Sequence, residues 1–326
     1  MGDRFDVLCM GELIADFTCC GRSGNGYPVY EQNPGGGAAN VAVSVARLGG
    51  RAAFLGKLGG DEICSALREA LEKEQVDLSA LVCDRESKIF LAFVTNSREG
   101  ERSFSFYGDH PADLELKPWE INPEIIDNAV ILSYGGRSIS TPEILKTTLT
   151  AAETGRKAGV RIAFDPNIRL PLWPDAGTAR RSTLEHIPCC DYLKLSVEEV
   201  NFLFGEIPAE EVAEEILSMG VSLLAVTDGP RGAAVYTKDY TIRHSGYQVK
   251  AIDTTGAGDS FWGSMLFQLA GVPAKVPEKA GMEKILAYAC ACGAITTTRQ
   301  GAVPGMPYPG EVREIVEFED FGTCTF

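Results

Sequence analysis

Histidine is scarce in this sequence, and long apolar runs are missing from it. Only three histidines occur among 326 residues, His110, His186 and His244, at no spacing typical of metal ligands. A metal or nucleophilic site built on histidine is therefore not expected. No stretch reaches the roughly 18 apolar residues that a membrane-spanning helix needs. The first residues also lack the basic and then apolar segments of a secretory signal, so we expect a cytoplasmic protein.

Paired cysteine motifs and an excess of positive charge are missing as well. The ten cysteines form no paired Cys-x-x-Cys set, and four of them stand as adjacent pairs at 19–20 and 189–190, which favours free thiols over disulfides. Asp and Glu number 45 against 30 Lys and Arg, a formal net charge of −15. Such a charge repels nucleic acid and anionic membranes, so neither is an expected partner. It does not exclude a phosphorylated ligand, which backbone amides can hold.

What is present is mostly an alternation of short apolar strands with helices. We expect strands at 5–10 and 52–55, a polar, glycine-rich loop at 19–37, a helix at 38–48 and a helix capped by Asp61. Residues 88–107 read as a β-hairpin joined at 97–101. From residue 129 onward, strands at 129–133, 160–164, 191–195 and 223–227 alternate with helices at 141–158 and 197–204. This order predicts a mostly parallel sheet covered by helices on both faces.

The most informative segment is Asp253-Thr-Thr-Gly-Ala-Gly-Asp259. Helical spacing of the apolar residues after it predicts a helix from near Gly258 to Gly271. Glycines at a helix N-terminus let successive backbone N–H groups point at an anion, such as a transferring phosphoryl group. Asp259 would lie beside that anion and could accept a proton from an attacking hydroxyl. The simpler interpretation is a glycine turn before a helix, with Asp259 complementing only the helix dipole.

A second glycine cluster, Pro34-Gly-Gly-Gly-Ala-Ala-Asn40, also precedes a helix. No Gly-Lys-Ser/Thr follows it, so it is not a P-loop. It could cradle phosphate, or it could let backbone amides approach a sugar while Asn40 binds hydroxyls. An entry loop without a ligand is the remaining interpretation.

These two segments, taken in order along the chain, resemble the two signatures of the PfkB-type carbohydrate kinases of the ribokinase superfamily. Gly11-Glu-Leu-Ile-Ala-Asp16 resembles the opening strand of that family, and the segments at 100–107 and 165–173 resemble those of bacterial fructokinases. Thr227-Asp-Gly-Pro-Arg-Gly232 resembles the nucleotide-binding turn. The resemblance spans nearly the whole chain in family order.

The resemblance implies roles for residues that match the family pattern. Asp259 would be the catalytic base, with the backbone at Gly256, Ala257 and Gly258 stabilising the phosphoryl group. The sugar would be held by Asp16, Gly36, Gly37, Asn40 and Arg169, together with Asp259. The residues implied to bind ATP are Lys194, Ser196, Glu199, Thr227, Gly229, Gly232, Gly256 and Gly258. Ser196 stands where the family has Asn, and Glu199 is implied to bind Mg²⁺ through water.

The expected fold is a ribokinase-like three-layer α/β/α sandwich with a mostly parallel sheet and a small β-sheet lid. The main domain would comprise 1–15, 36–87 and 114–326, and the lid 16–35 and 88–113. The expected activity is ATP-dependent phosphorylation of D-fructose at its 6-hydroxyl. Ribose, 2-keto-3-deoxygluconate and nucleosides stay open as acceptors, since Gly108 stands where fructokinases often carry Arg. A non-catalytic sugar-binding relative is a further alternative. The resemblance also admits K⁺ near Asp253 and Thr255, and a homodimer.

Overall fold

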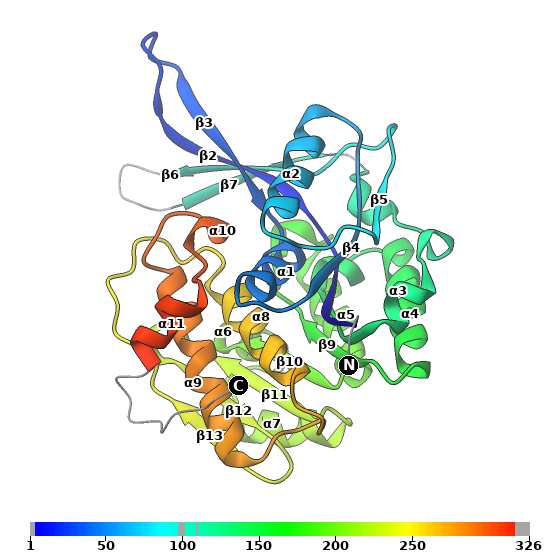
Figure 1. The fold of residues 1–326 in the computed structure, drawn as a ribbon, viewed down its shortest axis with the longest axis vertical. Helices are drawn as coiled ribbons and strands as arrows, with labels where there is room; N and C mark the ends of the chain where they lie inside the picture. Colours follow the sequence, from blue (N-terminus) through cyan, green and yellow to red (C-terminus); the bar gives the residue numbers. More distant parts are fainter. Residues whose placement is uncertain (1–3, 97–101, 109, 317–326) are drawn as a thin grey trace.

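The computed structural model describes residues 4–96, 102–108 and 110–316 (Figure 1). The strands are β1 (Phe5–Met10), β2 (Ile14–Arg22), β3 (Pro28–Gly35), β4 (Ala52–Leu58), β5 (Leu81–Cys83), β6 (Leu91–Asn96), β7 (Arg102–Tyr107), β8 (Ala129–Gly135), β9 (Arg161–Asp165), β10 (Tyr192–Ser196), β11 (Leu223–Thr227), β12 (Ala233–Tyr236) and β13 (Thr241–His244). The α-helices are α1 (Gly37–Arg47), α2 (Glu62–Lys73), α3 (Pro123–Asp127), α4 (Pro142–Lys157), α5 (Ala176–His186), α6 (Val197–Phe204), α7 (Ala209–Ser218), α8 (Ala257–Ala270), α9 (Lys279–Thr296), α10 (Ala302–Gly305) and α11 (Pro309–Val316).

Nine strands form one large sheet, in the order β13-β12-β11-β10-β9-β8-β1-β4-β5. All neighbours from β11 to β5 run parallel, and only β12 and β13 pair antiparallel at one edge. The predicted mostly parallel sheet is therefore confirmed. Because β1 lies between β4 and β8, the carboxyl ends of strands far apart in the sequence meet at one edge.

Helices cover both faces of this sheet, and alternating strand residues supply the two cores. Val7 and Cys9 of β1 belong to the core that also contains residues of α1, α8 and α9, whereas Leu8 and Met10 belong to the core that contains residues of α4, α5, α6 and α7. Successive side chains of a strand point to opposite faces, so a strand buried on both sides needs an apolar residue at nearly every position. The three-layer α/β/α arrangement is confirmed.

A separate four-stranded sheet, in the order β3-β2-β6-β7, lies beside the large one. The β2–β3 hairpin extends away from the body of the molecule, past the ends of β6 and β7 (Figure 1). The predicted loop at 19–37 is therefore wrong, because most of that segment is β-structure. Residues 20–29 are exposed, and the segment lacks the apolar alternation typical of a half-buried strand. Their pairing instead holds β2 between β3 and β6.

The hairpin predicted at 88–107 corresponds to β6 and β7, which pair antiparallel from Leu91↔Tyr107 to Asn96↔Arg102. The connection predicted at 97–101 lies outside the described residues. The boundaries of the two predicted domains remain a prediction.

Two helices begin where capping and glycine residues in the sequence predict, α2 after Asp61 and α8 after Gly256. The Asp61 carboxylate accepts a hydrogen bond from the Cys64 backbone N–H at 3.0 Å, so Asp61 caps α2 as expected. At the start of α8, Gly256 adopts a left-handed conformation with φ 78°, which favours glycine. A Cβ at that position would lie 2.6 Å from the Ala302 Cβ, so space as well as conformation requires glycine there.

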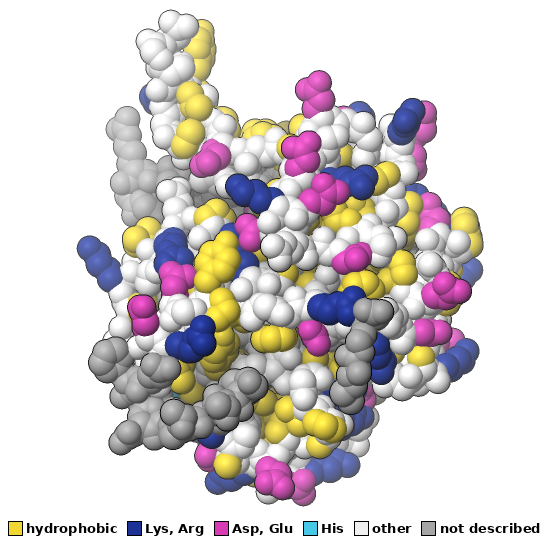
Figure 2. All heavy atoms as spheres, in the orientation of Figure 1, with side chains coloured by type: hydrophobic (Ala, Val, Ile, Leu, Met, Phe, Trp, Pro, Cys, Tyr) yellow, Lys and Arg dark blue, Asp and Glu magenta, His cyan; other side chains and the backbone are white. Residues whose placement is uncertain are grey.

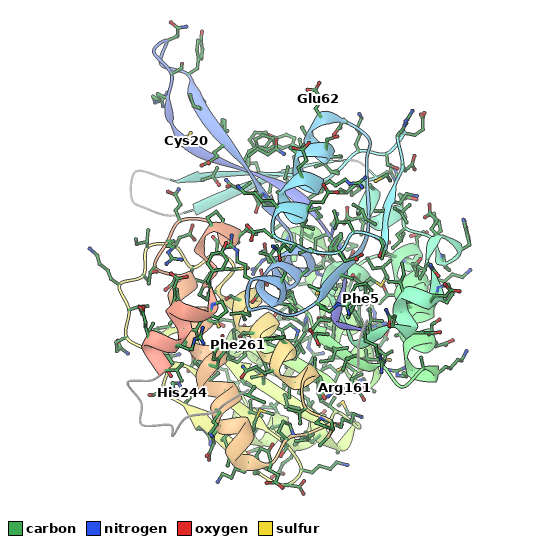
Figure 3. All side chains as sticks on the ribbon, viewed as in Figure 1. Phe5, Cys20, Glu62, Arg161, His244 and Phe261 are labelled. Carbon is green, nitrogen blue, oxygen red and sulfur yellow. The ribbon has the colours of Figure 1, made fainter. Side chains whose placement is uncertain are left out.

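Charged side chains and cysteines are distributed as follows. Over the face drawn in Figure 2, acidic and basic side chains are interspersed. All cysteines in the described part of the chain are free. Figure 3 shows Cys20 on the projecting hairpin and Phe261 on α8 inside the body. Among the described residues, no helix combines the length and apolar character needed to cross a membrane.

Candidate active site

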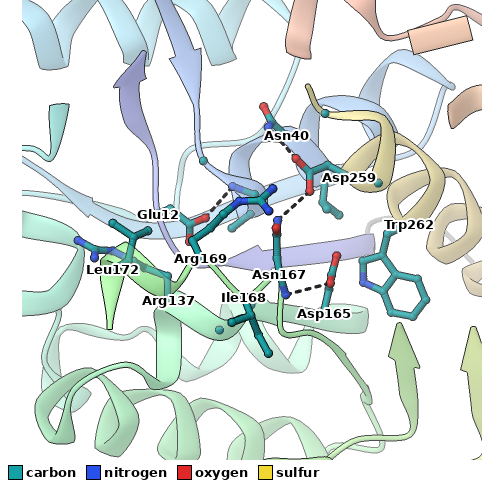
Figure 4. Close-up of a pocket in the computed structure, with 18 of the residues that line it drawn as sticks. Glu12, Asn40, Arg137, Asp165, Asn167, Ile168, Arg169, Leu172, Asp259 and Trp262 are labelled. Carbon is teal, nitrogen blue, oxygen red and sulfur yellow. Dashed lines mark hydrogen bonds between the residues drawn. The ribbon is translucent and has the colours of Figure 1, made fainter. Parts of the chain in front are cut away.

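A cavity of about 820 Å³ lies at the carboxyl ends of β1, β8, β9 and β10, with the small sheet as one wall (Figure 4). Open α/β sheets bind ligands at this edge. The small sheet contributes a row of neighbouring residues, Asp16 of β2, Ala92 of β6 and Phe106 of β7. Most of the site residues predicted from the sequence line this one cavity: Asp16, Gly36, Gly37, Asn40, Arg169, Lys194, Ser196, Glu199, Thr227, Gly256, Gly258 and Asp259. Ala257, Gly229 and Gly232 do not line it.

Asp259 lies buried in the first turn of α8, where two amide side chains hold its carboxylate. Asn40 donates to Oδ2 at 2.8 Å, and Asn167 donates to Oδ1 at 3.1 Å. Figure 4 shows the two amides approaching Asp259 from two sides. Burial, followed by the nearby Asp165 carboxylate, raises the pKa of Asp259, against the lowering effects of Asn40, Lys194 and Arg169. An oriented carboxylate with a raised pKa is suited to accept a proton.

The turn before α8 leaves several backbone N–H groups available. Within the described residues, the N–H groups of Gly256, Gly258 and Asp259 have no hydrogen-bond acceptor. Ala257 differs, because its N–H donates to the Thr254 carbonyl at 3.3 Å. These available amides lie on either side of Ala257 at the positive end of the helix dipole, a position that would favour an anion.

The glycine cluster before α1 brings backbone close to the connection between β1 and β2. Gly36 has φ 104°, and a Cβ there would lie 2.4 Å from the Glu12 carbonyl oxygen. The Gly37 N–H donates to Glu12 Oε1 at 2.6 Å. Asn40 is buried, and its Oδ1 has no partner among the described residues. A buried amide oxygen left without a donor destabilises the free protein, so a ligand hydroxyl would complete this position.

Asp16 projects into the cavity from β2. Burial, together with the charge of Asp259, raises the pKa of Asp16 to about 6. A Cβ on Gly35 would lie 2.3 Å from Asp16 Oδ2, so glycine leaves room for this carboxylate. Two carboxylates thus face one cavity, Asp16 from the small sheet and Asp259 from the first turn of α8.

Lys194 enters the cavity from β10 and forms a buried ion pair with Asp165 of β9, with Nζ 2.6 Å from Oδ2. Burial opposes the lysine charge, but Asp165 and Glu199 outweigh it and raise the pKa of Lys194. A Cβ on Gly258 would lie 3.5 Å from the Lys194 Nζ, so this cation stands beside the start of α8. The position suits a group that neutralises phosphate charge.

Ser196 and Glu199 have clear local roles. The Ser196 hydroxyl accepts from the Glu199 N–H, and Glu199 Oε2 accepts from the Ser196 N–H at 2.8 Å, a capping box that starts α6. The other carboxylate oxygen of Glu199 accepts from the Ile168 N–H at 2.7 Å. The described residues contain no group of three His, Cys, Asp or Glu side chains that could hold a metal. Both carboxylate oxygens of Glu199 accept hydrogen bonds from backbone N–H groups.

The remaining predicted residues lie at the end of β11 or outside the cavity. Thr227 ends β11 and lines the cavity, whereas Gly229 begins the short 3₁₀ turn after it and Gly232 follows that turn. Asp253 accepts from the Thr255 N–H at 2.7 Å and from the Gly301 N–H at 2.8 Å. These bonds join the start of the Asp253–Asp259 segment to the turn before α10.

Polar cavity residues that sequence reasoning missed include Glu12, Asp165 and Asn167. All three stood in segments that resembled the family, but no local pattern singled them out. The Asn167 backbone has φ 41°, a region in which Asn is among the tolerated residues. That conformation directs the Asn167 amide toward Asp259. The sequence signal that could have identified Asn167 is its position as a polar residue two places after the end of a predicted strand.

Comparison with known proteins places this geometry among sugar kinases. A model described as pfkB family carbohydrate kinase matches residues 4–308. Probable fructokinase-6, chloroplastic, of Arabidopsis thaliana is 40% identical over 312 residues, covering 94% of this chain and 81% of that protein. The crystal structure of fructokinase with bound ATP from Xylella fastidiosa has a TM-score of 0.86 at 30% identity, covering 96% of this chain and 98% of that one. Fructokinase from Vibrio cholerae O395, in a fructose, ADP and calcium ion bound form, has a TM-score of 0.84 at 31% identity, covering 94% and 97%.

Proposed function

The chain belongs to the pfkB family of carbohydrate kinases, and we propose that it transfers the γ-phosphoryl group of ATP to the 6-hydroxyl of D-fructose. The observation that carries the proposal is the Asp259 carboxylate, held by Asn40 and Asn167 at the start of α8 in a cavity that also contains Asp16. Relatives named fructokinase, in sequence and in structure, support fructose as the acceptor.

Asp259 removes the proton from the sugar hydroxyl as that oxygen attacks the γ-phosphorus. The bond from this phosphorus to the bridging oxygen of ADP breaks, and ADP leaves. The amides of Gly256, Gly258 and Asp259 stabilise charge on the transferring oxygens. Lys194 adds positive charge beside them. We expect kcat to fall with decreasing pH, because protonation of Asp259 removes the base.

Mg²⁺ bound with the nucleotide would neutralise charge on the phosphates, and Glu199 would order water near it. Thr227, Gly229 and Gly232 form the turn proposed to receive the nucleotide. K⁺ near Asp253 and Thr255 is part of the same proposal.

Asp16, Asn40 and the Gly36–Gly37 backbone bind sugar hydroxyls, and Arg169 lies at the same end of the cavity. The small sheet acts as a lid, since Asp16, Ala92 and Phe106 already form one wall of the cavity. Closing this wall over the sugar would exclude water that otherwise hydrolyses ATP.

A coupled assay of ADP release across D-fructose, ribose, 2-keto-3-deoxygluconate and nucleosides tests the proposal. D-fructose should give the highest kcat/KM. Asp259→Asn should lower kcat by about 10² to 10⁴, the usual contribution of a positioned general base, with little change in melting temperature. Wild-type kcat in this variant would contradict the mechanism, and a higher kcat/KM for ribose or 2-keto-3-deoxygluconate would contradict the acceptor.

We also propose that two copies associate through the outer face of the small sheet. Asp16 and Ala92 face the cavity, so their neighbours Phe17 and Phe93 lie on the opposite face of the small sheet, where their ring centroids are 5.0 Å apart. Tyr107 packs edge-on against Phe93 and is 59% exposed. Light scattering on the wild type should give twice the mass of one chain, and Tyr107→Glu should lower the measured mass to that of one chain. A monomeric wild type would contradict the dimer.

A further inference from the structure

A second charged group lines the cavity beside the predicted site residues. Glu12 lies in the connection from β1 to β2, and Arg137 lies in a 3₁₀ turn (Gly136–Ile139) directly after β8. Since β1 and β8 are parallel neighbours, their carboxyl ends place these two residues on the same wall. Figure 4 places both on the side of Asn167 opposite to Trp262.

Arg137 is held firmly but keeps unused donors. Its Nε donates to Asp113 Oδ2 at 2.7 Å, and its guanidinium lies 4.6 Å from the centre of the Phe90 ring. Its side chain is 9% exposed and lines the cavity. The Nη1 group has no hydrogen bond to any residue that the structure describes. A nearly buried guanidinium that lines the cavity thus keeps an Nη1 group unpaired within the described chain.

Glu12 complements it with an unused acceptor. Its Oε1 is engaged by the Gly37 N–H, but its Oε2 is buried and has no partner within the described chain. Burial raises the pKa of Glu12 to about 7, and Asp113 adds to this effect while Arg137 opposes it. Among the described residues, Arg137 is thus the one cation beside two carboxylates, Glu12 and Asp113, in this charged group.

The unpartnered buried atoms of the described chain gather at this cavity. Among the described residues, four fully buried side-chain atoms have no hydrogen-bond partner, and three of them belong to cavity residues: Glu12 Oε2, Asn40 Oδ1 and Trp262 Nε1. The fourth belongs to Thr183, which does not line the cavity. Buried polar groups are normally paired, so this grouping indicates that a polar ligand completes the wall.

We propose that Glu12 and Arg137 together bind one hydroxyl of the sugar, at the end opposite to the phosphorylated carbon, and thereby select neutral sugars over sugar acids. This inference rests on the proposed sugar kinase activity. A hydroxyl can donate to Glu12 and accept from Arg137 at the same time. A carboxylate can only accept, so it would satisfy Arg137 but, at a pH above the pKa of Glu12, face the like charges of Glu12 and Asp113.

The test compares D-fructose with 2-keto-D-gluconate, in which a carboxylate replaces the C1 hydroxymethyl group. Wild type should prefer fructose by at least about 100-fold in kcat/KM. Glu12→Gln keeps the size of the side chain and an oxygen for the Gly37 N–H, but it removes the negative charge. In this variant the KM for fructose should rise about tenfold, and the preference over the acid should fall at least tenfold. Glu214→Gln, an exposed change of the same charge on α7, should leave the preference at its wild-type value.

Direct binding separates recognition from folding. Titration calorimetry on Glu12→Gln, with its melting temperature measured alongside, should show weakened fructose binding by a folded protein. An unchanged fructose KM and an unchanged neutral-to-acid preference in Glu12→Gln would overturn the inference. If another neutral sugar proves the better acceptor, the same comparison with its corresponding acid still decides the role of Glu12. In that case fructose is refuted as the acceptor. If Glu12→Gln still reduces the preference for the neutral sugar over its acid, the role of Glu12 and Arg137 in sugar selection is supported.

Discussion

Replacing Asp16 by Asn should stabilise the free protein while it weakens sugar binding. Asp16 accepts no side-chain or backbone hydrogen bond from the described residues, yet burial and the charge of Asp259 raise its pKa from 3.8 to about 6. A raised pKa in the folded state means that folding disfavours the ionised form. The stability that this group contributes is therefore full below the unfolded pKa and is lost as pH rises through the folded one.

The size of the effect follows from the shift. One pKa unit corresponds to about 1.36 kcal/mol, so ionised Asp16 lowers the unfolding free energy by about 1.6 kcal/mol at pH 5 and about 3 kcal/mol at pH 8. Asn does not titrate, so the difference between variant and wild type should grow with pH in this way. Urea denaturation at pH 4, 5, 6.5 and 8 measures it. Asp239→Asn, the same change on an exposed side chain, should show no comparable growth.

Function should change in the opposite direction. Loss of charged hydrogen bonds to sugar hydroxyls costs roughly 1.5–3 kcal/mol, so the fructose KM should rise about 10- to 100-fold while the ATP KM stays nearly constant. The stabilisation of wild type by saturating fructose should largely disappear in the variant. An Asp16→Asn protein that is no more stable than wild type at pH 8 would refute the reasoning about burial. A KM effect confined to ATP would remove Asp16 from the sugar end.

Three further substitutions test sugar binding, catalysis and stability separately. Gly35→Ala places a methyl group against the Asp16 carboxylate, so the fructose KM should rise at least about tenfold, as for a lost charged hydrogen bond. An unchanged fructose KM would show that the Asp16 side chain can shift freely. Asn167→Ala removes one donor to Asp259 and should lower kcat about tenfold, equivalent to one hydrogen bond of about 1.4 kcal/mol; steady-state kinetics would contradict this if only KM changed. Arg161→Met removes the guanidinium that donates to the Leu269 carbonyl at 2.9 Å, at the end of α8. Urea denaturation should therefore show a free energy of unfolding lower by about 2 kcal/mol. The kcat should stay near that of wild type, because the start of the helix is undisturbed.

Regular elements with strong local signals could be predicted from the sequence. Helix α8 has apolar residues at helical spacing and glycines at both ends, and β8 to β11 are short apolar runs separated by helices. The β2–β3 hairpin could not be recognised in this way, because its exposed residues give no apolar alternation. Its strands are held by pairing with each other and with β6, which is distant in the sequence.

The same limit applies to the site. Asp259 and the glycines could be predicted because their chemistry lies within seven consecutive residues. The role of Asn167 depends on its backbone conformation after β9, and that of Glu12 on the approach of Gly37. Both follow from contacts between segments, which spacing along one segment does not reveal.

The position of β1 between β4 and β8 also has a consequence for how the chain matures. Every strand of the large sheet on one side of the β1–β8 boundary comes from residues before 84, and every strand on the other side comes from residues after 128. Asp16, Gly37 and Asn40 come from the first part, whereas Asn167, Lys194 and Asp259 come from the second. The Asn40–Asp259 hydrogen bond joins the two parts, as does the packing of α1 on α8. During refolding, regained phosphoryl transfer would therefore report the docking of two chain halves rather than the completion of either one.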